Sequence, residues 1–142
     1  MEKRGQLEMS FGTIFSILLI IIFIAFAFYA ITKFITLQSD VKNGQFSNSL
    51  QNDVDTVWKS AQATQPETYS LPSSINKVCF INSQSGNLIM YGKNGPEQSY
   101  NINHLNISAM TQNGDSCFNV TSGQLKITLQ RNFGDSLVTV TS

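Results

Sequence analysis

The chain has 142 residues, and its nine basic and nine acidic side chains balance to a formal net charge of zero. This length suits one compact domain together with an anchor. Only 13% of the residues are charged, and no block of one sign occurs. The sequence therefore shows neither a basic groove for nucleic acid nor a charged patch for acidic lipid.

An uncharged stretch lies between Glu8 and Lys33, and from Phe11 to Ile31 it is almost wholly apolar. A helix of about 20 apolar residues crosses a bilayer. The stretch predicts a transmembrane helix over residues 10–37, preceded by a short leader over residues 1–9. A buried core helix is disfavoured, because a domain of about 100 residues rarely encloses a helix that is apolar on every face.

A cleaved secretory signal is the rival interpretation of the same stretch. Ala25-Phe26-Ala27 resembles the small-x-small cleavage site that follows the apolar region of such a signal. However, the apolar run continues beyond it to Ile31 and resumes at Phe34 and Ile35. The continuation favours a retained membrane helix.

Charges and sequons indicate the orientation of the helix. Lys3 and Arg4 precede the apolar run, which favours a cytoplasmic N-terminus and a head outside the cell. Two N-glycosylation acceptor patterns occur in the distal part, at Asn106 and Asn119. We therefore expect a single-pass protein of the cell membrane with an extracytoplasmic, glycosylated head.

Residues 38–65 predict an amphipathic helix that continues the membrane helix without a break, from about Ser10 to Ala63. Apolar residues recur there every three or four positions and form one stripe: Phe46, Leu50, Val54, Val57 and Ala61. On the opposite, polar face, Asp55 and Lys59 are spaced for a favourable ion pair. Pro66 and Pro72 are expected to end the helical region.

Residues 66–142 predict a β-rich head. Short runs of β-branched and aromatic residues alternate with turn residues, and the predicted strands are 77–81, 88–91, 117–120, 125–130 and 137–141. Residues 124–142 are typical of a hairpin that turns at 132–135. The predicted fold class is α+β: a long N-terminal helix, half membrane-spanning and half amphipathic, packed on a small antiparallel β-sheet head.

The head contains the only two cysteines, Cys79 and Cys117. An even count in an exported domain favours one disulfide, and two buried thiols are the alternative. The pair lacks CxxC spacing, and His104, the only histidine, has no metal-ligand pattern around it. No catalytic motif is present, so we expect no enzymatic activity, no cofactor and no metal site.

The segment Lys3-Arg4-Gly5-Gln6-Leu7 directly precedes the apolar run. It resembles the class III signal peptide of type IV pilin-like proteins, especially archaeal ones. The wider layout is also similar to that family: a long helix, half apolar and half amphipathic, followed by a β-rich head with a cysteine pair.

The resemblance implies that a prepilin-type peptidase cuts after Gly5 and leaves Gln6 as the mature N-terminus. Family members usually carry Glu at the fifth mature position. Here that position is Ser10, and the acid, Glu8, stands third and is expected to take its role in assembly. Gly12 and Ser16 form a small-xxx-small pattern that allows helices to approach closely.

The implied function is that of a structural pilin or pseudopilin subunit. It assembles with copies of itself, or with related pilin-like subunits, into a surface filament or secretion assembly. The alternative is a monomeric, membrane-anchored binding or envelope domain outside the cytoplasm.

Overall fold

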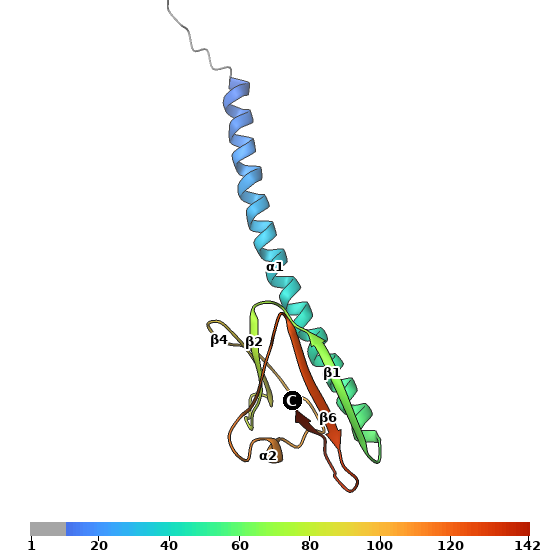
Figure 1. Ribbon diagram of the computed structural model, residues 1–142. Coiled ribbons are helices and arrows are strands. Elements are labelled where there is room, and N and C mark those ends of the chain that lie inside the picture. The colour runs from blue at the N-terminus through green and yellow to red at the C-terminus, as the bar shows by residue number, and fades with distance from the viewer. Residues whose placement is uncertain (1–10) are drawn as a thin grey trace, which may run out of the picture. The chain divides into compact units, whose positions relative to one another are not determined.

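The structure is a computed structural model, and it describes residues 11–142. The chain forms two compact units, Met1–Gln38 and Ser39–Ser142. One helix, α1 (Phe11–Lys59, 49 residues), supplies all the described residues of the first unit and begins the second (Figure 1). Because α1 contains no proline, its backbone ladder has no missing donor. The predicted continuity of the apolar and amphipathic helices is thus confirmed.

The rest of the second unit consists of two antiparallel sheets and one short helix, α2 (Ile107–Met110). One sheet has the order β1-β6-β7, and the other has the order β4-β3-β2-β5. The strands are β1 (Ala63–Ser70), β2 (Ile75–Phe80), β3 (Leu88–Gly92), β4 (Gly95–Tyr100), β5 (Ser116–Asn119), β6 (Gln124–Arg131) and β7 (Thr139–Thr141). The predicted α+β class is confirmed.

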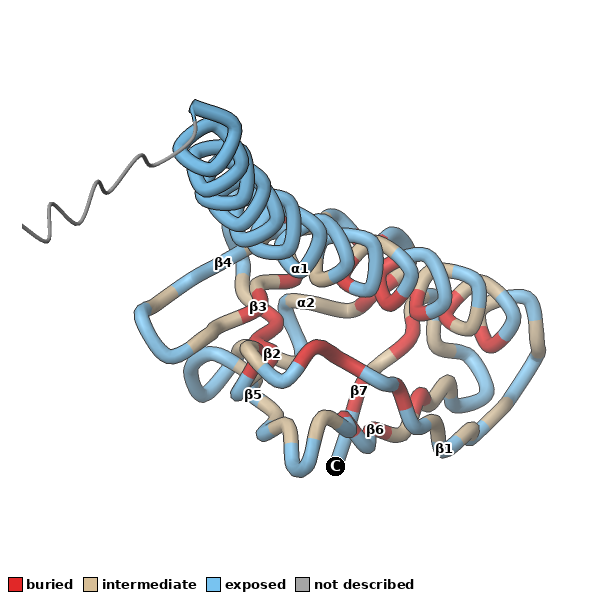
Figure 2. The backbone as a smooth tube through the Cα atoms, turned by 90° about the horizontal axis from the view of Figure 1, so that it is seen from above, coloured by how far each residue is buried: buried red, intermediate tan, exposed pale blue. Residues whose placement is uncertain are grey.

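The core of the second unit lies between α1 and the sheets, as the red segments of Figure 2 indicate. The stripe on α1 contributes Phe46, Leu50, Val54 and Val57, each at most 3% exposed. Strand β6 alternates as predicted, so that its apolar side chains are buried while Lys126 faces water. Other buried core residues come from both sheets and their loops: Tyr69, Val78, Phe80, Leu88, Met90, Ile102, Leu105, Val138 and Val140.

The end of α1 differs from the prediction. The helix ends at Lys59, so Ala61 lies outside it and is exposed, and the predicted boundary at residue 65 is wrong. The Arg131 guanidinium of β6 donates hydrogen bonds to the carbonyl oxygens of Trp58 and Ser60. These bonds satisfy acceptors that a longer helix would have used, and the chain then turns into β1.

Strands β1 and β4 were not predicted, and Pro66 lies within β1 instead of ending the helix. All eight residues of β1 pair with β6, from Ala63 opposite Arg131 to Ser70 opposite Gln124. Both β1 and β4 are edge strands, and each contains a proline, Pro66 and Pro96. An edge strand tolerates a proline because one side of its backbone has no ladder to complete.

The five predicted strands are present with shifted ends. The predicted C-terminal hairpin is confirmed as the β6–β7 pair, in which Leu129 lies opposite Val140. Its connection is longer than expected because β7 begins only at Thr139.

Candidate assembly surface

The first unit presents an apolar surface on every side of α1. Every residue from Phe11 to Gln38 is exposed, including Phe23, Phe26 and Phe28, each about two-thirds exposed. The most apolar 18-residue window of this helix has a mean hydropathy of 3.0, and none of it is buried. By length and composition, this part of α1 is able to cross a membrane.

Several hydroxyl groups on this apolar surface are hydrogen-bonded within the helix itself. Ser16 Oγ donates to the Gly12 carbonyl oxygen at 2.7 Å, and Thr36 Oγ1 donates to the Thr32 carbonyl oxygen at 3.1 Å. Thr32 Oγ1 donates to the Tyr29 carbonyl oxygen at 2.8 Å. Burying a hydroxyl without a partner is costly. These side chains therefore suit an environment without water, whether lipid or another helix.

Gly12 and Ser16, the predicted contact residues for helix assembly, lie one turn apart on α1 and share that hydrogen bond. With its hydroxyl turned back onto its own helix, Ser16 presents little bulk to a neighbour. Close approach of a second helix at this place stays a prediction. The other residues of the resemblance, Gly5, Gln6 and Glu8, lie outside the described residues.

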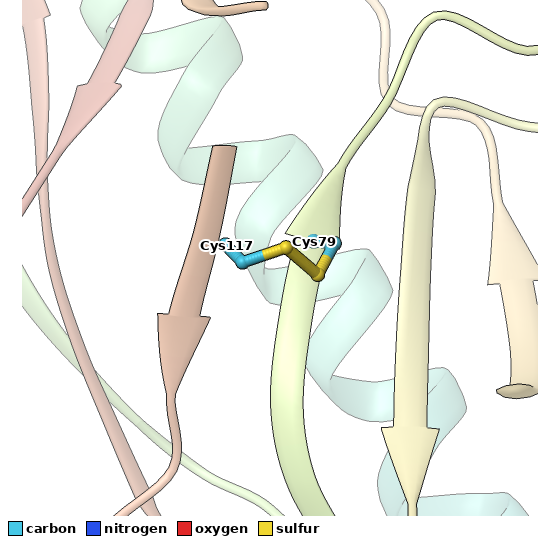
Figure 3. The surroundings of a disulfide bond; sticks show 2 residues. All are labelled: Cys79 and Cys117. Atoms are coloured by element: carbon cyan, nitrogen blue, oxygen red, sulfur yellow. A yellow bond between two sulfur atoms is a disulfide. The ribbon is translucent and has the colours of Figure 1, made fainter. Parts of the chain in front are cut away.

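The two cysteines join neighbouring strands of the second sheet (Figure 3). Cys79 of β2 lies directly opposite Cys117 of β5, with the Cα atoms 4.0 Å apart, and the two form a disulfide. The predicted disulfide is confirmed, and the alternative of two free thiols is excluded. Cys79 is buried and Cys117 is exposed, so the bridge connects the core layer to an edge strand.

The two predicted glycosylation residues lie in different surroundings. Asn119 is exposed at the end of β5. Asn106 is half-buried and caps α2: its Oδ1 accepts a hydrogen bond from the Ala109 N–H at 3.1 Å. The Asn106 N–H also donates to the Val138 carbonyl oxygen at 2.7 Å. Asn119 is therefore the more accessible acceptor, and its modification stays a prediction.

A polar cluster that sequence reasoning missed ties the end of α1 to a loop. His104 has a left-handed backbone with φ at 65°, and its ring stacks on Trp58 with the centroids 3.8 Å apart. His104 Nδ1 lies 2.9 Å from Asp55 Oδ1, to which Gln51 Nε2 also donates at 2.8 Å. Asp55 thus contacts a residue far along the chain, whereas helical spacing had suggested Lys59.

A second contact, which is partly buried, joins α1 to β1. The Tyr69 hydroxyl donates to Asp53 Oδ2 at 2.7 Å, and its ring meets Phe46 edge to face with the centroids 5.2 Å apart. Burial raises the pKa of the Tyr69 hydroxyl well above its usual value. The hydrogen bond to Asp53 and the negative charges of Asp53 and Glu67 add to the increase in pKa.

Between residues 11 and 142, no group of three or more His, Cys, Asp or Glu side chains is placed to hold a metal ion. A shallow depression of about 370 Å³ lies beside Asn119. Small polar side chains and one lysine line it: Thr121, Ser122, Gln124 and Lys126. The two cysteines are joined in the disulfide, and the His104 ring is stacked against Trp58.

No known protein family, curated protein or solved structure matches the chain.

Proposed function

We propose that this protein is a structural subunit similar to a type IV pilin or pseudopilin. Its head stands outside the cytoplasm, and the apolar part of α1 anchors it in the cell membrane. Copies of the chain, or related subunits, then assemble through this apolar helix into a surface filament or secretion assembly. The protein acts without enzymatic chemistry and without a cofactor.

The observation that carries the proposal is the surface of α1 from Phe11 to Gln38, which is exposed on every side. Such a helix is stable only when lipid or other apolar helices cover it, because exposing it to water is unfavourable in proportion to its apolar area. A bundle of identical helices provides the same cover as lipid. The chain can therefore exchange one environment for the other, which is what assembly from a membrane requires.

The head supports the proposal through its sheet edges. Strands β1 and β4 each contain the dipeptide Pro-Glu, Pro66-Glu67 and Pro96-Glu97, in which both prolines and Glu97 are exposed and Glu67 is half-buried. Proline and a charged side chain both hinder the addition of another strand. Assembly through helices, with the heads on the outer surface, is thus consistent with the way these edges are built.

Processing at Gly5 tests the proposal. The N-terminal mass of protein isolated from its own host, and the fraction recovered in filaments after shearing, are compared for the wild type and for Gly5→Val. We expect the wild type to begin at Gln6 and to enter the filament fraction. The Gly5→Val protein should keep residues 1–5, remain in the membrane and fail to assemble, because a larger side chain blocks approach to the scissile bond.

The matched control is Gly44→Val in α1. A Cβ atom at Gly44 meets nothing within 4 Å, so the same substitution there leaves the fold intact. This variant should be processed and should insert like the wild type. A wild-type protein that keeps residues 1–5 and stays monomeric would contradict the proposal. It would support the second candidate, a monomeric anchored domain, which the presence of Ser10 at the fifth mature position favours.

A further inference from the structure

Lys33 is the only charged residue of the first unit between Phe11 and Gln38, and no carboxylate lies in that stretch. Its ammonium group lies over the ring of Tyr29, with Nζ 5.8 Å from the ring centroid. The two residues are one helical turn apart, so the ring covers the apolar stem of the lysine. Together they form one amphipathic pair on an otherwise apolar helix, the Tyr29–Lys33 pair.

The distance of this pair from the start of the apolar run matches the thickness of a bilayer. At about 1.5 Å per residue, Tyr29 lies about 27 Å and Lys33 about 33 Å along the helix from Phe11. The hydrocarbon core of a bilayer is about 30 Å thick. If Phe11 lies at the cytoplasmic boundary, the outer boundary falls between Tyr29 and Lys33.

We infer that the Tyr29–Lys33 pair anchors the helix at the outer membrane–water interface, where the Lys33 ammonium binds lipid headgroup phosphates. The inference rests on the proposed crossing of the membrane, but not on assembly. An aromatic ring with a polar tip suits the headgroup level, and a lysine keeps its charge out of hydrocarbon by extending toward it. The pair therefore fixes how deeply the helix sits.

If the pair fixes the depth of the helix, the two threonines on either side of Lys33 lie at different depths relative to the membrane surface. Thr32 and Thr36 are both exposed, and the hydroxyl of each is bonded within the helix. Thr32 lies at the level of the boundary, between the two residues of the Tyr29–Lys33 pair, whereas Thr36 lies about 6 Å farther along the helix on the water side. They provide a matched pair of positions for a reporter thiol.

The test uses the full-length protein, with its native disulfide oxidised, in sealed vesicles. Thr32→Cys and Thr36→Cys are each labelled with a charged, membrane-impermeant maleimide, and Ser73→Cys in an exposed loop gives the fraction of heads outside. The vesicles consist of phosphatidylcholine alone or of equal parts phosphatidylcholine and phosphatidylglycerol. Labelling in detergent provides the rate for each thiol without a membrane.

We expect the thiol at position 36 to react at least about tenfold faster than the thiol at position 32 in both kinds of vesicle, because maleimide requires a solvated thiolate. Adding Lys33→Leu should slow labelling at position 36 to the rate at position 32, since the helix then sinks. Adding Lys33→Arg should preserve the difference.

Three other results would overturn the inference. The first is an equal labelling rate at positions 32 and 36, whether slow or fast, and the second is labelling that Lys33→Leu leaves unchanged. The third is a difference in labelling that appears only in vesicles with phosphatidylglycerol. Lys33 would then respond to the net negative charge of the membrane surface and not to the phosphate that both lipids carry. Loss of the protein from the vesicle fraction on flotation would instead show that the helix does not insert, which contradicts the proposed function itself.

Discussion

Leu50 lies on the buried stripe of α1 and is completely buried, whereas Asn52, two positions along the same helix, is exposed. Replacing Leu50 with Ala removes apolar contacts and leaves a cavity. We expect Leu50→Ala to lower the free energy of unfolding by about 2–5 kcal/mol. Denaturant titration of the full-length protein in detergent, followed by the fluorescence of the single tryptophan, Trp58, measures this change.

Asn52→Ala is the control in the same helix and should change the free energy of unfolding by no more than about 0.5 kcal/mol. Equal effects of the two substitutions would show that the stripe does not pack on the sheets in the isolated protein. The stripe would then be a contact between subunits.

Tyr69 makes the stability depend on alkaline pH. In the unfolded chain tyrosine loses its proton near its usual pKa of about 10. In the fold its pKa is higher, because burial and the neighbouring Asp53 disfavour the phenolate. Its contribution is therefore fully present below about pH 10 and is lost as the pH rises above that value.

Tyr69→Phe should remove this part of the alkaline decline, although the variant is less stable at neutral pH because the hydrogen bond to Asp53 is lost. Free energies of unfolding at a series of pH values between about 8 and 11, a range that includes the usual pKa of tyrosine, test the expectation. A decline of the same steepness in the wild type and the variant would contradict it.

At the scale of elements, the end of α1 depends on a strand that is distant in sequence. The part-buried Arg131 guanidinium donates to carbonyl oxygens at the helix end and, through Nε, to the Asp135 carbonyl oxygen at 2.8 Å. A cation at this place also interacts favourably with the helix dipole. Arg131 thus connects α1, β6 and the β6–β7 turn.

We expect Arg131→Gln to lower the free energy of unfolding by about 1–3 kcal/mol, because it removes a charged donor and leaves part-buried carbonyl groups unpaired. Lys126→Gln, on the exposed face of the same strand, removes a charge without a buried contact and should have an effect within about 0.5 kcal/mol. Denaturant titration of both proteins provides the comparison. An Arg131→Gln protein as stable as Lys126→Gln would exclude a role for Arg131 in holding the helix end.

At the scale of the whole molecule, the disulfide holds together parts of the head that are 38 residues apart in sequence. Because β5 is a short edge strand, much of its attachment depends on this link to β2. In the chain-entropy description, closing a loop of this length stabilises the fold by about 4 kcal/mol. The double variant Cys79→Ser, Cys117→Ser should lose about that amount.

Unfolding of the double variant is compared with unfolding of the wild type with and without a reducing agent. The reduced wild type should resemble the variant, and the reducing agent should have no effect on the variant itself. Wild-type stability that is insensitive to reduction would show that the strand pairing alone holds β5.

The sequence by itself determined the features that depend on local patterns. The apolar run predicted a helix long enough to cross a membrane. The stripe of Phe46, Leu50, Val54 and Val57 predicted which face of the amphipathic part of α1 is buried. The alternation in β6 likewise predicted which residues point inward. In each case burial imposes a period of 3.6 or 2 residues that is visible along the chain.

Only the tertiary structure decided where α1 ends, that β1 and β4 are strands, and which residue partners Asp55. Strands β1 and β4 are polar edge strands that form because a neighbouring strand offers a backbone ladder, and polar side chains leave little periodic signal. Arg131 ends the helix and His104 reaches Asp55 from distant parts of the sequence. Such contacts depend on how the chain returns to itself, which local patterns do not record.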